Sequence, residues 1–340
     1  MRLSQWLGLA ALMMGGYICW QMRQIVLLVF LAIVLTTALQ RAVRALQGWG
    51  WRRSPAVGAV LAGVTLLLVI FLGVVLPPFW EQFKVLLAIA PSVGHKLQVL
   101  WLNLENEELK QSLERYGVHS SVGESLSLLG ANLFPRLVAF FSNSLNASVQ
   151  LLFALGLAVM MLLHPRPYRA LALKLFPAFY RRRADEILTL SESALGNWLT
   201  GILINSLFIG LFSGIGLWLL GIKLVLVHAV MAGILNFVPN IGPAASVVFP
   251  LMIALLDSPW KIGAVLGLYF IIQNLESYWL TPIVMAKQVS LLPAVTLMAQ
   301  LIFASVLGLL GLILALPLTV VVKTWLEEAL IKDILDPWVD

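Results

Sequence analysis

Two groups of polar residues interrupt stretches that are otherwise suited to lipid. The segment "NFVPNIGPAAS", residues 236–246, places prolines, asparagines and a glycine inside the uncharged run 224–256. Proline lacks an amide donor and clashes with the preceding helical turn, so this run cannot be one regular helix. Broken backbone at membrane depth is tolerated only where protein buries it or water reaches it, and transporters use such breaks as binding sites. We therefore expect residues 236–243 to contact a solute or an ion.

The second group surrounds Glu276, the one acidic residue of the apolar run 262–280. A carboxylate within a membrane span is costly and marks an ion or solute path by default. Gln273 and Asn274 lie on adjacent faces of the predicted helix, with Gln273 about one turn from the carboxylate. The alternative is that Glu276 lies near the helix end and meets interfacial water before Thr281-Pro282.

Together the two groups predict a substrate-binding site. Asn236 and Asn240 are suited to donate hydrogen bonds to the carbonyl groups that the break frees at Leu235 and nearby. The residues that we expect to form the site are Asn205, Asn236, Pro239, Asn240, Gly242, Pro243, Gln273, Asn274, Glu276, Thr281 and Pro282.

The composition indicates which elements must position these residues. Of the 340 residues, 61% are hydrophobic and only 11% are charged, and the mean hydropathy is +0.96. So few charges do not cover the surface of a soluble protein of this size. The long uncharged runs lack the alternation of a barrel strand. The predicted fold class is therefore all-α: a polytopic bundle of membrane helices, with broken or re-entrant helices in the C-terminal half.

Four regions follow from the pattern of charge and hydropathy. Residues 1–78 hold three membrane helices, predicted at 6–20, 25–39 and 56–76, the last closed by Pro77-Pro78. Residues 79–146 form an amphipathic extramembrane insertion, residues 147–325 a membrane transport region with a basic linker at 164–198, and residues 326–340 a charged tail. The second long uncharged run, 288–322, also contains prolines and glycines, so we expect it to be broken too.

Arginine and lysine set the expected orientation. Their largest clusters, residues 41–53 and 166–183, are predicted to be cytoplasmic, which places both termini inside and residues 79–146 outside. The net charge of +6 comes from these flanks and does not indicate nucleic-acid binding.

The other polar side chains indicate no catalytic or metal-binding site. The single cysteine, Cys19, excludes an internal disulfide and a cysteine-based metal cluster. We expect Asn205 and Gln300 to form hydrogen bonds between helices, and His228 to be a packed or interfacial side chain. No catalytic or nucleotide-binding motif is present, so we expect no enzyme, no cofactor and no direct use of ATP.

Four stretches resemble one family of transporters. The stretch "GILNFVPNIGPAAS", residues 233–246, looks like the signature of the autoinducer-2 exporter (AI-2E) family. Three further stretches are similar to it in order and spacing: "FALGLAVMMLLHPRPYRALALKLFPAFYRRRADEIL", "YFIIQNLESYWLTPIVMAKQVSLLPAV" and "GLLGLILALPLTVVVK". The sequence departs from the family at Ile202, where glutamine is frequent, and at Asn240, where an aromatic residue is frequent, so the substrate does not transfer with the resemblance.

The resemblance implies eight membrane helices in a prokaryotic inner membrane and a homo-oligomer, with a pentamer as the expected form. The first functional hypothesis is a secondary permease that exports a small polar metabolite similar to autoinducer-2. The second is a sodium/proton antiporter in which Glu276 exchanges its proton for a cation. The third is a membrane scaffold whose insertion, residues 79–146, binds a partner. The expected partners are a small polar solute or ion and the lipid bilayer.

Overall fold

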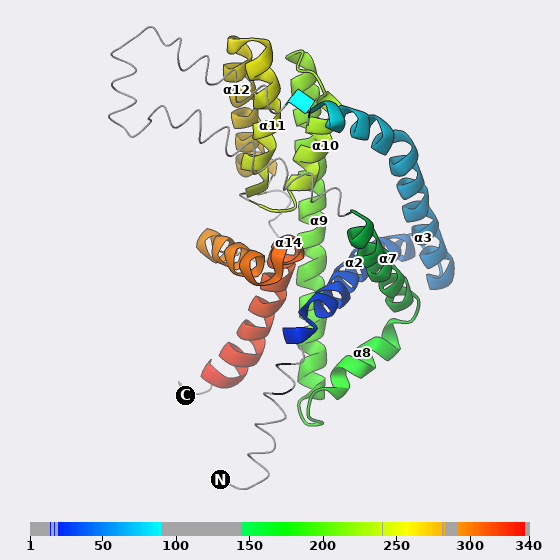
Figure 1. The fold of residues 1–340 in the computed structure, drawn as a ribbon. Coiled ribbons are helices and arrows are strands. Elements are labelled where there is room, and N and C mark those ends of the chain that lie inside the picture. The colour runs from blue at the N-terminus through cyan, green and yellow to red at the C-terminus, as the bar shows by residue number, and fades with distance from the viewer. Residues whose placement is uncertain are drawn as a thin grey trace. The chain divides into compact units, whose positions relative to one another are not determined.

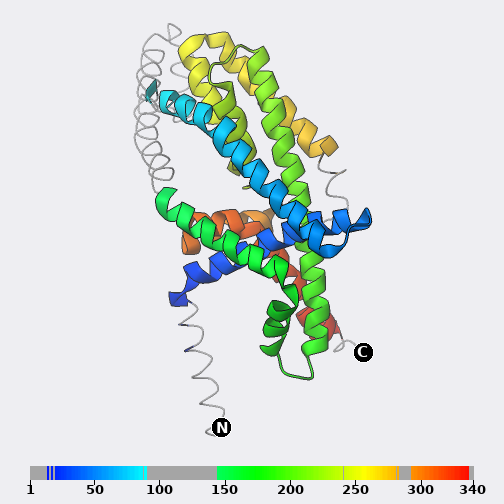
Figure 2. The same ribbon diagram turned by 90° about the vertical axis from the view of Figure 1, so that its right-hand side faces the viewer.

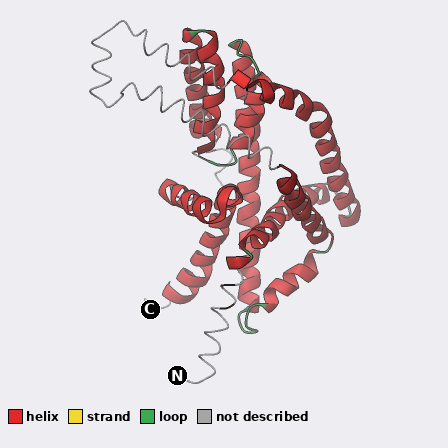
Figure 3. Cartoon of the chain, viewed as in Figure 1, coloured by secondary structure: helices red, strands yellow, loops and turns green. Residues whose placement is uncertain are grey.

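The computed structural model describes most of the membrane part of the chain. The described residues are Met14, Tyr17 and the ranges 20–86, 88–89, 144–239, 241–280, 282 and 292–336. All regular elements among them are helical (Figure 3), as the predicted fold class requires. Most of the first predicted span, most of the insertion, Asn240 and Thr281 lie outside the described residues.

Two compact units make up the chain. Unit 1 comprises residues 1–63, 147–200 and 287–340, and unit 2 comprises residues 64–146 and 201–286. Two long helices, α3 (Arg53–Ile70) and α9 (Arg181–Leu219), contribute to both units. The other helices of unit 1 are α2 (Arg23–Gly48), α7 (Ser144–Leu163), α8 (Pro165–Lys174) and α14 (Pro293–Trp325). Those of unit 2 are α10 (Val225–Leu235), α11 (Ile241–Asp257) and α12 (Pro259–Leu275).

Four of the described helices are long and apolar enough to cross a membrane, or five if the bent pair α7–α8 counts as one span. The pair bends by 98° at His164, because the residue before a proline is pushed out of helical geometry. The helices α10 and α11 are shorter. At 11 residues α10 is about 16 Å long, roughly half of a hydrocarbon core of about 30 Å.

Two predicted helix boundaries are wrong. The third span does not close at Pro77-Pro78 but continues to Leu86 as one helix of 34 residues. A π-helical turn, Phe71–Val75, precedes the prolines, and the Leu76 amide bonds to the Phe71 carbonyl five residues back. A π turn changes the hydrogen-bonding register, so the helix can continue through prolines that have no amide hydrogen to donate. Likewise, the sequence pattern predicts a polar helix at residues 184–197 and a separate fifth span at residues 199–222, but the structure joins them in the single 39-residue helix α9.

In unit 1 the basic residues of α2 pair with the polar first half of α9. The Arg41 guanidinium donates to the Asn197 side-chain oxygen at 2.8 Å, and Arg44 forms an ion pair with Glu192. Gly196 lies beside Arg41, where a Cβ atom would come within 3.1 Å of the guanidinium. These charges therefore face protein partners, as expected of residues at the end of a membrane span.

Polar contacts also attach the C-terminal helix to the basic linker. Arg183 donates to both carboxylate oxygens of Asp333 at 3.1 Å and to Glu328 at 2.8 Å, while the Tyr180 hydroxyl donates to Asp333 at 3.0 Å. We call these four residues the tail cluster. Hydrogen bonding to Asp333 raises the pKa of Arg183, and the bond from Arg183 lowers the pKa of Asp333. Bonds from Lys332 and Arg183 lower the pKa of Glu328.

Removal of the central cation is expected to release the tail. In Arg183→Ala, amide hydrogen exchange over residues 326–335 should accelerate by about tenfold at pH 7, because both carboxylates lose their shared partner. The control is Arg182→Ala, since the Arg182 side chain is 94% exposed and forms its ion pair with the linker residue Glu186, not with the tail. Equal exchange in the two variants would show that the tail cluster does not hold the tail.

The same cluster predicts an acid dependence. The folded pKa values of Glu328 and Asp333 lie below the ordinary values of 4.5 and 3.8. Their contribution to tail stability is therefore complete above the ordinary values and is lost as the pH falls through the lowered ones. Exchange of the tail, corrected for the intrinsic rate, should be faster at about pH 3 than at pH 7 in the native protein, and this difference should shrink in Arg183→Ala.

Candidate functional site

The predicted break in the run 224–256 is present, and it forms a tight hairpin. The chain leaves α10 at Asn236, turns, and returns as α11, so that α10, α11 and α12 lie side by side (Figures 1 and 2). Pro243 falls in the first turn of α11, where a helix has no use for the amide hydrogen that proline lacks. The prolines therefore end one helix and are accommodated at the start of the next.

Glycine is required where the two arms of the hairpin meet. A Cβ atom on Gly242 would overlap the backbone carbonyl of Leu235. That carbonyl accepts a hydrogen bond from the Val238 amide at 2.9 Å, and the Val238 carbonyl accepts one from the Gly242 amide at 2.7 Å. The expectation that Asn236 would supply donors to the Leu235 carbonyl is wrong, because the backbone of the turn closes on itself.

Asn236 instead reaches a neighbouring helix. Its side chain is 2% exposed, and its amide nitrogen lies 3.4 Å from the Ser206 hydroxyl oxygen on α9, to which it donates. Ser206 was not among the predicted site residues, although its position beside Asn205 in an apolar run was a usable signal. The close approach of the two helices depends on Gly233, where a Cβ atom would come within 3.1 Å of the Ser206 carbonyl oxygen.

Glu276 is buried in unit 2 and held by two amide donors. Its carboxylate is the acceptor for the Asn205 side chain at 3.1 Å and for the Gln273 side chain at 2.8 Å, and the residue is 8% exposed. It begins a π-helical turn, Glu276–Leu280, a local geometry that is frequent at functional sites. The Asn205 side-chain oxygen forms no hydrogen bond with any described residue. The Asn205 oxygen therefore places a further hydrogen-bond acceptor beside the buried Glu276 carboxylate.

Consecutive residues of α9 join the two predicted groups. Asn205 contacts Glu276 after α12, and Ser206 contacts Asn236 at the end of α10. We define the carboxylate cluster as the five residues that these hydrogen bonds connect: Asn205, Ser206, Asn236, Gln273 and Glu276. The cluster belongs entirely to unit 2.

The remaining predicted residues fall into three groups. Gly242 and Pro243 shape the hairpin, and Pro239 lies half-buried in its turn. The half-buried Asn274 donates its side-chain amide to the Phe270 carbonyl on its own helix, so it does not join the carboxylate cluster. Pro282 is exposed. Asn240 and Thr281 lie outside the described residues.

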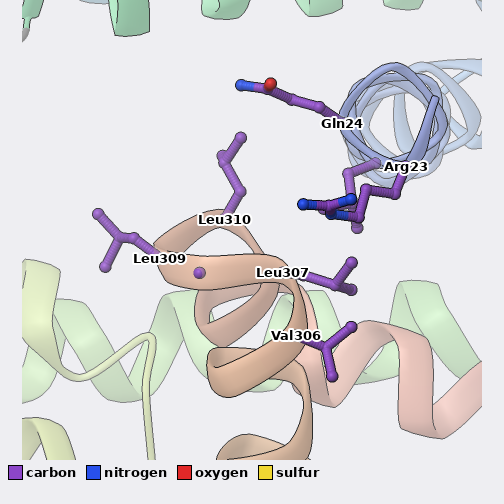
Figure 4. Close-up of a pocket in the computed structure, with 8 residues that line it drawn as sticks. Arg23, Gln24, Val306, Leu307, Leu309 and Leu310 are labelled. Atoms are coloured by element: carbon purple, nitrogen blue, oxygen red, sulfur yellow. The ribbon is translucent and has the colours of Figure 1, made fainter. Parts of the chain in front are cut away.

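A pocket of about 410 Å³ lies in unit 1, at the predicted break of the second long run (Figure 4). There Gly308 adopts φ 67° and ψ −150°, a conformation open to glycine, and α14 bends. Arg23 and Gln24 of α2 face the bend, whose other lining side chains are leucine and valine. The described lining contains no carboxylate.

A hydrogen-bonded carboxylate beside a short, broken helical hairpin is, in a helical membrane protein, typical of the class of membrane transport proteins. Comparison with known sequences gives the family. Residues 9–331 match the AI-2E family transporter family, and the chain belongs to it.

Individual relatives agree with this assignment. The chain is similar to YrrI of Bacillus subtilis (strain 168), with 31% identity over 149 residues, which is 44% of this chain and 42% of YrrI. It is 25% identical to YueF of the same organism over 250 residues, 74% of this chain and 66% of YueF. It is 23% identical to the AI-2 transport protein TqsA of Escherichia coli (strain K12) over 311 residues, 89% of this chain and 84% of TqsA. The chain thus spans less than two thirds of the length of YrrI and of YueF.

The hairpin geometry makes Gly242 sensitive to substitution. Gly242→Ala should destabilise unit 2 by about 1–3 kcal/mol, because its methyl group must displace the backbone of the turn. The control is Gly263→Ala on α12, where nothing lies within 4 Å of the added methyl group and alanine is the better helix former. Melting temperatures of the purified variants in detergent measure the difference. Equal melting temperatures would contradict the close contact between Gly242 and Leu235.

Proposed function

We propose that the protein is a secondary permease that exports a small polar solute across the bacterial inner membrane. The observation that carries the proposal is the carboxylate cluster, in which hydrogen bonds from Asn205 and Gln273 reach a buried Glu276 beside the hairpin turn. Buried ionisable groups within membrane spans are rare and mark solute or ion paths. The relative TqsA is named an AI-2 transport protein, which makes autoinducer-2 the first solute to test.

The geometry supports a mechanism of hydrogen-bond exchange. A solute hydroxyl or amide group would donate to the Glu276 carboxylate in place of one side-chain amide, and the freed amide would then donate to the solute. The Asn205 side-chain oxygen offers an acceptor at the same place. Exchange among fixed partners keeps the carboxylate satisfied at each stage, which limits the cost of moving solute through a low-dielectric interior. Since the sequence has no nucleotide-binding motif, a gradient would supply the energy.

A sodium/proton antiporter is the second candidate. It is favoured by the composition of the carboxylate cluster, where one ionisable side chain is surrounded by neutral oxygen-bearing residues. Such a site can hold either a proton or a hard cation, which prefers oxygen ligands. In this mechanism Glu276 would release its proton when the cation binds.

The sequence-based proposals about organisation fit this function. We propose cytoplasmic termini, a transport region at residues 147–325, and an outward insertion at residues 79–146. We also propose a homo-oligomer, for which the family resemblance suggests a pentamer. A non-transporting scaffold that binds its partner through the insertion is the remaining alternative, and a flux measurement separates it from both transport functions.

Neutralising the carboxylate without changing its shape tests the proposal. In liposomes that contain the purified protein, Glu276→Gln should lower autoinducer-2 efflux by about ten- to hundredfold, because hydrogen bonds to a charged acceptor are lost. Asp257→Asn is the control, since Asp257 pairs with Lys261 at the end of α11. Proton flux driven by a sodium gradient is measured in parallel with a pH-sensitive dye.

The outcomes separate the candidate functions. Loss of sodium/proton exchange with intact binding of the neutral solute would favour the antiporter, and an unchanged pH dependence would exclude it. If the native protein transports neither solute nor ions, the membrane scaffold is the candidate function that remains. Efflux in Glu276→Gln equal to that of the native protein would remove Glu276 from the transport site.

A further inference from the structure

A second group of buried polar side chains lies two helical turns from the carboxylate cluster. Ser213 on α9 is fully buried, Ser246 on α11 is 1% exposed, and the Tyr269 hydroxyl on α12 is shielded from solvent. The Tyr269 hydroxyl lies beside the hydroxyls of Ser213 and Ser246. We call these three residues the hydroxyl cluster. It belongs to unit 2, like the carboxylate cluster.

The two clusters repeat at the same spacing on facing helices. Ser213 follows Ser206 by seven residues, and Glu276 follows Tyr269 by seven, so each pair shares one helix face about 10 Å apart. The helices are antiparallel, because Asn205 contacts Glu276 whereas Gly216 packs against Leu268. The hydroxyl cluster therefore lies further along α9 than the carboxylate cluster, nearer to the turn that joins α9 to α10.

A single apolar layer separates the clusters. Ile209 of α9, Ala232 of α10 and Ile272 of α12 are buried and pack together. Ile209 lies between Ser206 and Ser213 along its helix. We call these three residues the apolar layer. Three adjacent helices thus alternate from polar to apolar to polar within one buried core.

In the hydroxyl cluster, the Ser246 hydroxyl has its partner in its own helix: it donates to the Pro243 carbonyl at 2.8 Å. The Ser213 and Tyr269 hydroxyls form no hydrogen bond with any described residue. His228 is fully buried and lies at the same level of α10, since the neighbouring Ala229 packs against Gly214. Buried polar groups without partners are costly, and a bound water or a solute hydroxyl at this place would lower that cost.

We propose that the hydroxyl cluster is a second polar station on the transport route, and that the apolar layer is the barrier between it and the carboxylate cluster. This inference rests on the proposed function. The station has no charged side chain and offers groups that both donate and accept hydrogen bonds, so it takes neutral hydroxyl groups, carried by the solute or by water. An apolar constriction between polar stations opens when it is wetted and closes when it is dry.

Accessibility of introduced thiols tests whether the station is wet. The chain has one cysteine, so Cys19→Ser provides a background without thiols. In that background Ser213→Cys and Ser246→Cys are nearly isosteric, and Ala254→Cys is the control, since Ala254 is fully buried in the apolar core cluster of the same unit. A water-borne methanethiosulfonate reagent should modify the two station cysteines about tenfold faster than the control. Equal rates would overturn the proposal.

Removal of one hydroxyl tests the role of the station in transport. Tyr269→Phe should lower efflux by about three- to tenfold, whereas Tyr278→Phe, at an 80% exposed tyrosine, should not change it. A loss confined to autoinducer-2 efflux assigns the station to solute hydroxyls, and a loss confined to proton flux assigns it to water. Unchanged flux in Tyr269→Phe would overturn the proposal even if the cysteines react. Native protein without any flux would refute the proposed function instead, and the thiol rates would still report whether the station is wet.

Discussion

A carboxylate buried among apolar helices loses its water, and its stability then depends on the donors that replace it. Glu276 receives one donor from its own helix, through Gln273, and one from α9, through Asn205. The bond from Asn205 fixes the position of α9 relative to α12 along their common axis. Because Ser206 follows Asn205 directly and accepts from Asn236, the same short piece of α9 also fixes the end of α10. One polar network therefore holds three helices in register.

The parts of this site that depend on local chemistry were predictable from the sequence. The break after α10 follows from Pro239, Gly242 and Pro243, whose backbone restrictions act within a few residues. The placement of Gln273 within reach of Glu276 follows from helical spacing, because residues three apart lie on the same side of a helix. Neither prediction required knowledge of any neighbouring helix.

The parts that depend on packing or on backbone adjustment were not predictable. The partner of Glu276 across the helix interface was one of several membrane amides, and only the approach of α9 selects Asn205. The Leu235 carbonyl needed no side chain, because the amide of Val238 reaches it within the turn. Pro77-Pro78 does not end its helix, because a π turn placed just before it changes the hydrogen-bonding register. In each case the backbone or a neighbouring helix offered a solution that residue types alone do not reveal.

The alternation of layers in unit 2 follows from two opposing demands. Helices in lipid gain little from apolar contact with one another, so hydrogen bonds and close backbone packing must supply much of their specificity. A core that was polar throughout would leave many groups unsatisfied whenever water was absent. One apolar layer, about a single helical turn thick, keeps the two polar clusters apart. Ile209 and Ile272 fill this layer from opposite sides, and Ala232, the smallest of the three, lets α10 approach closely.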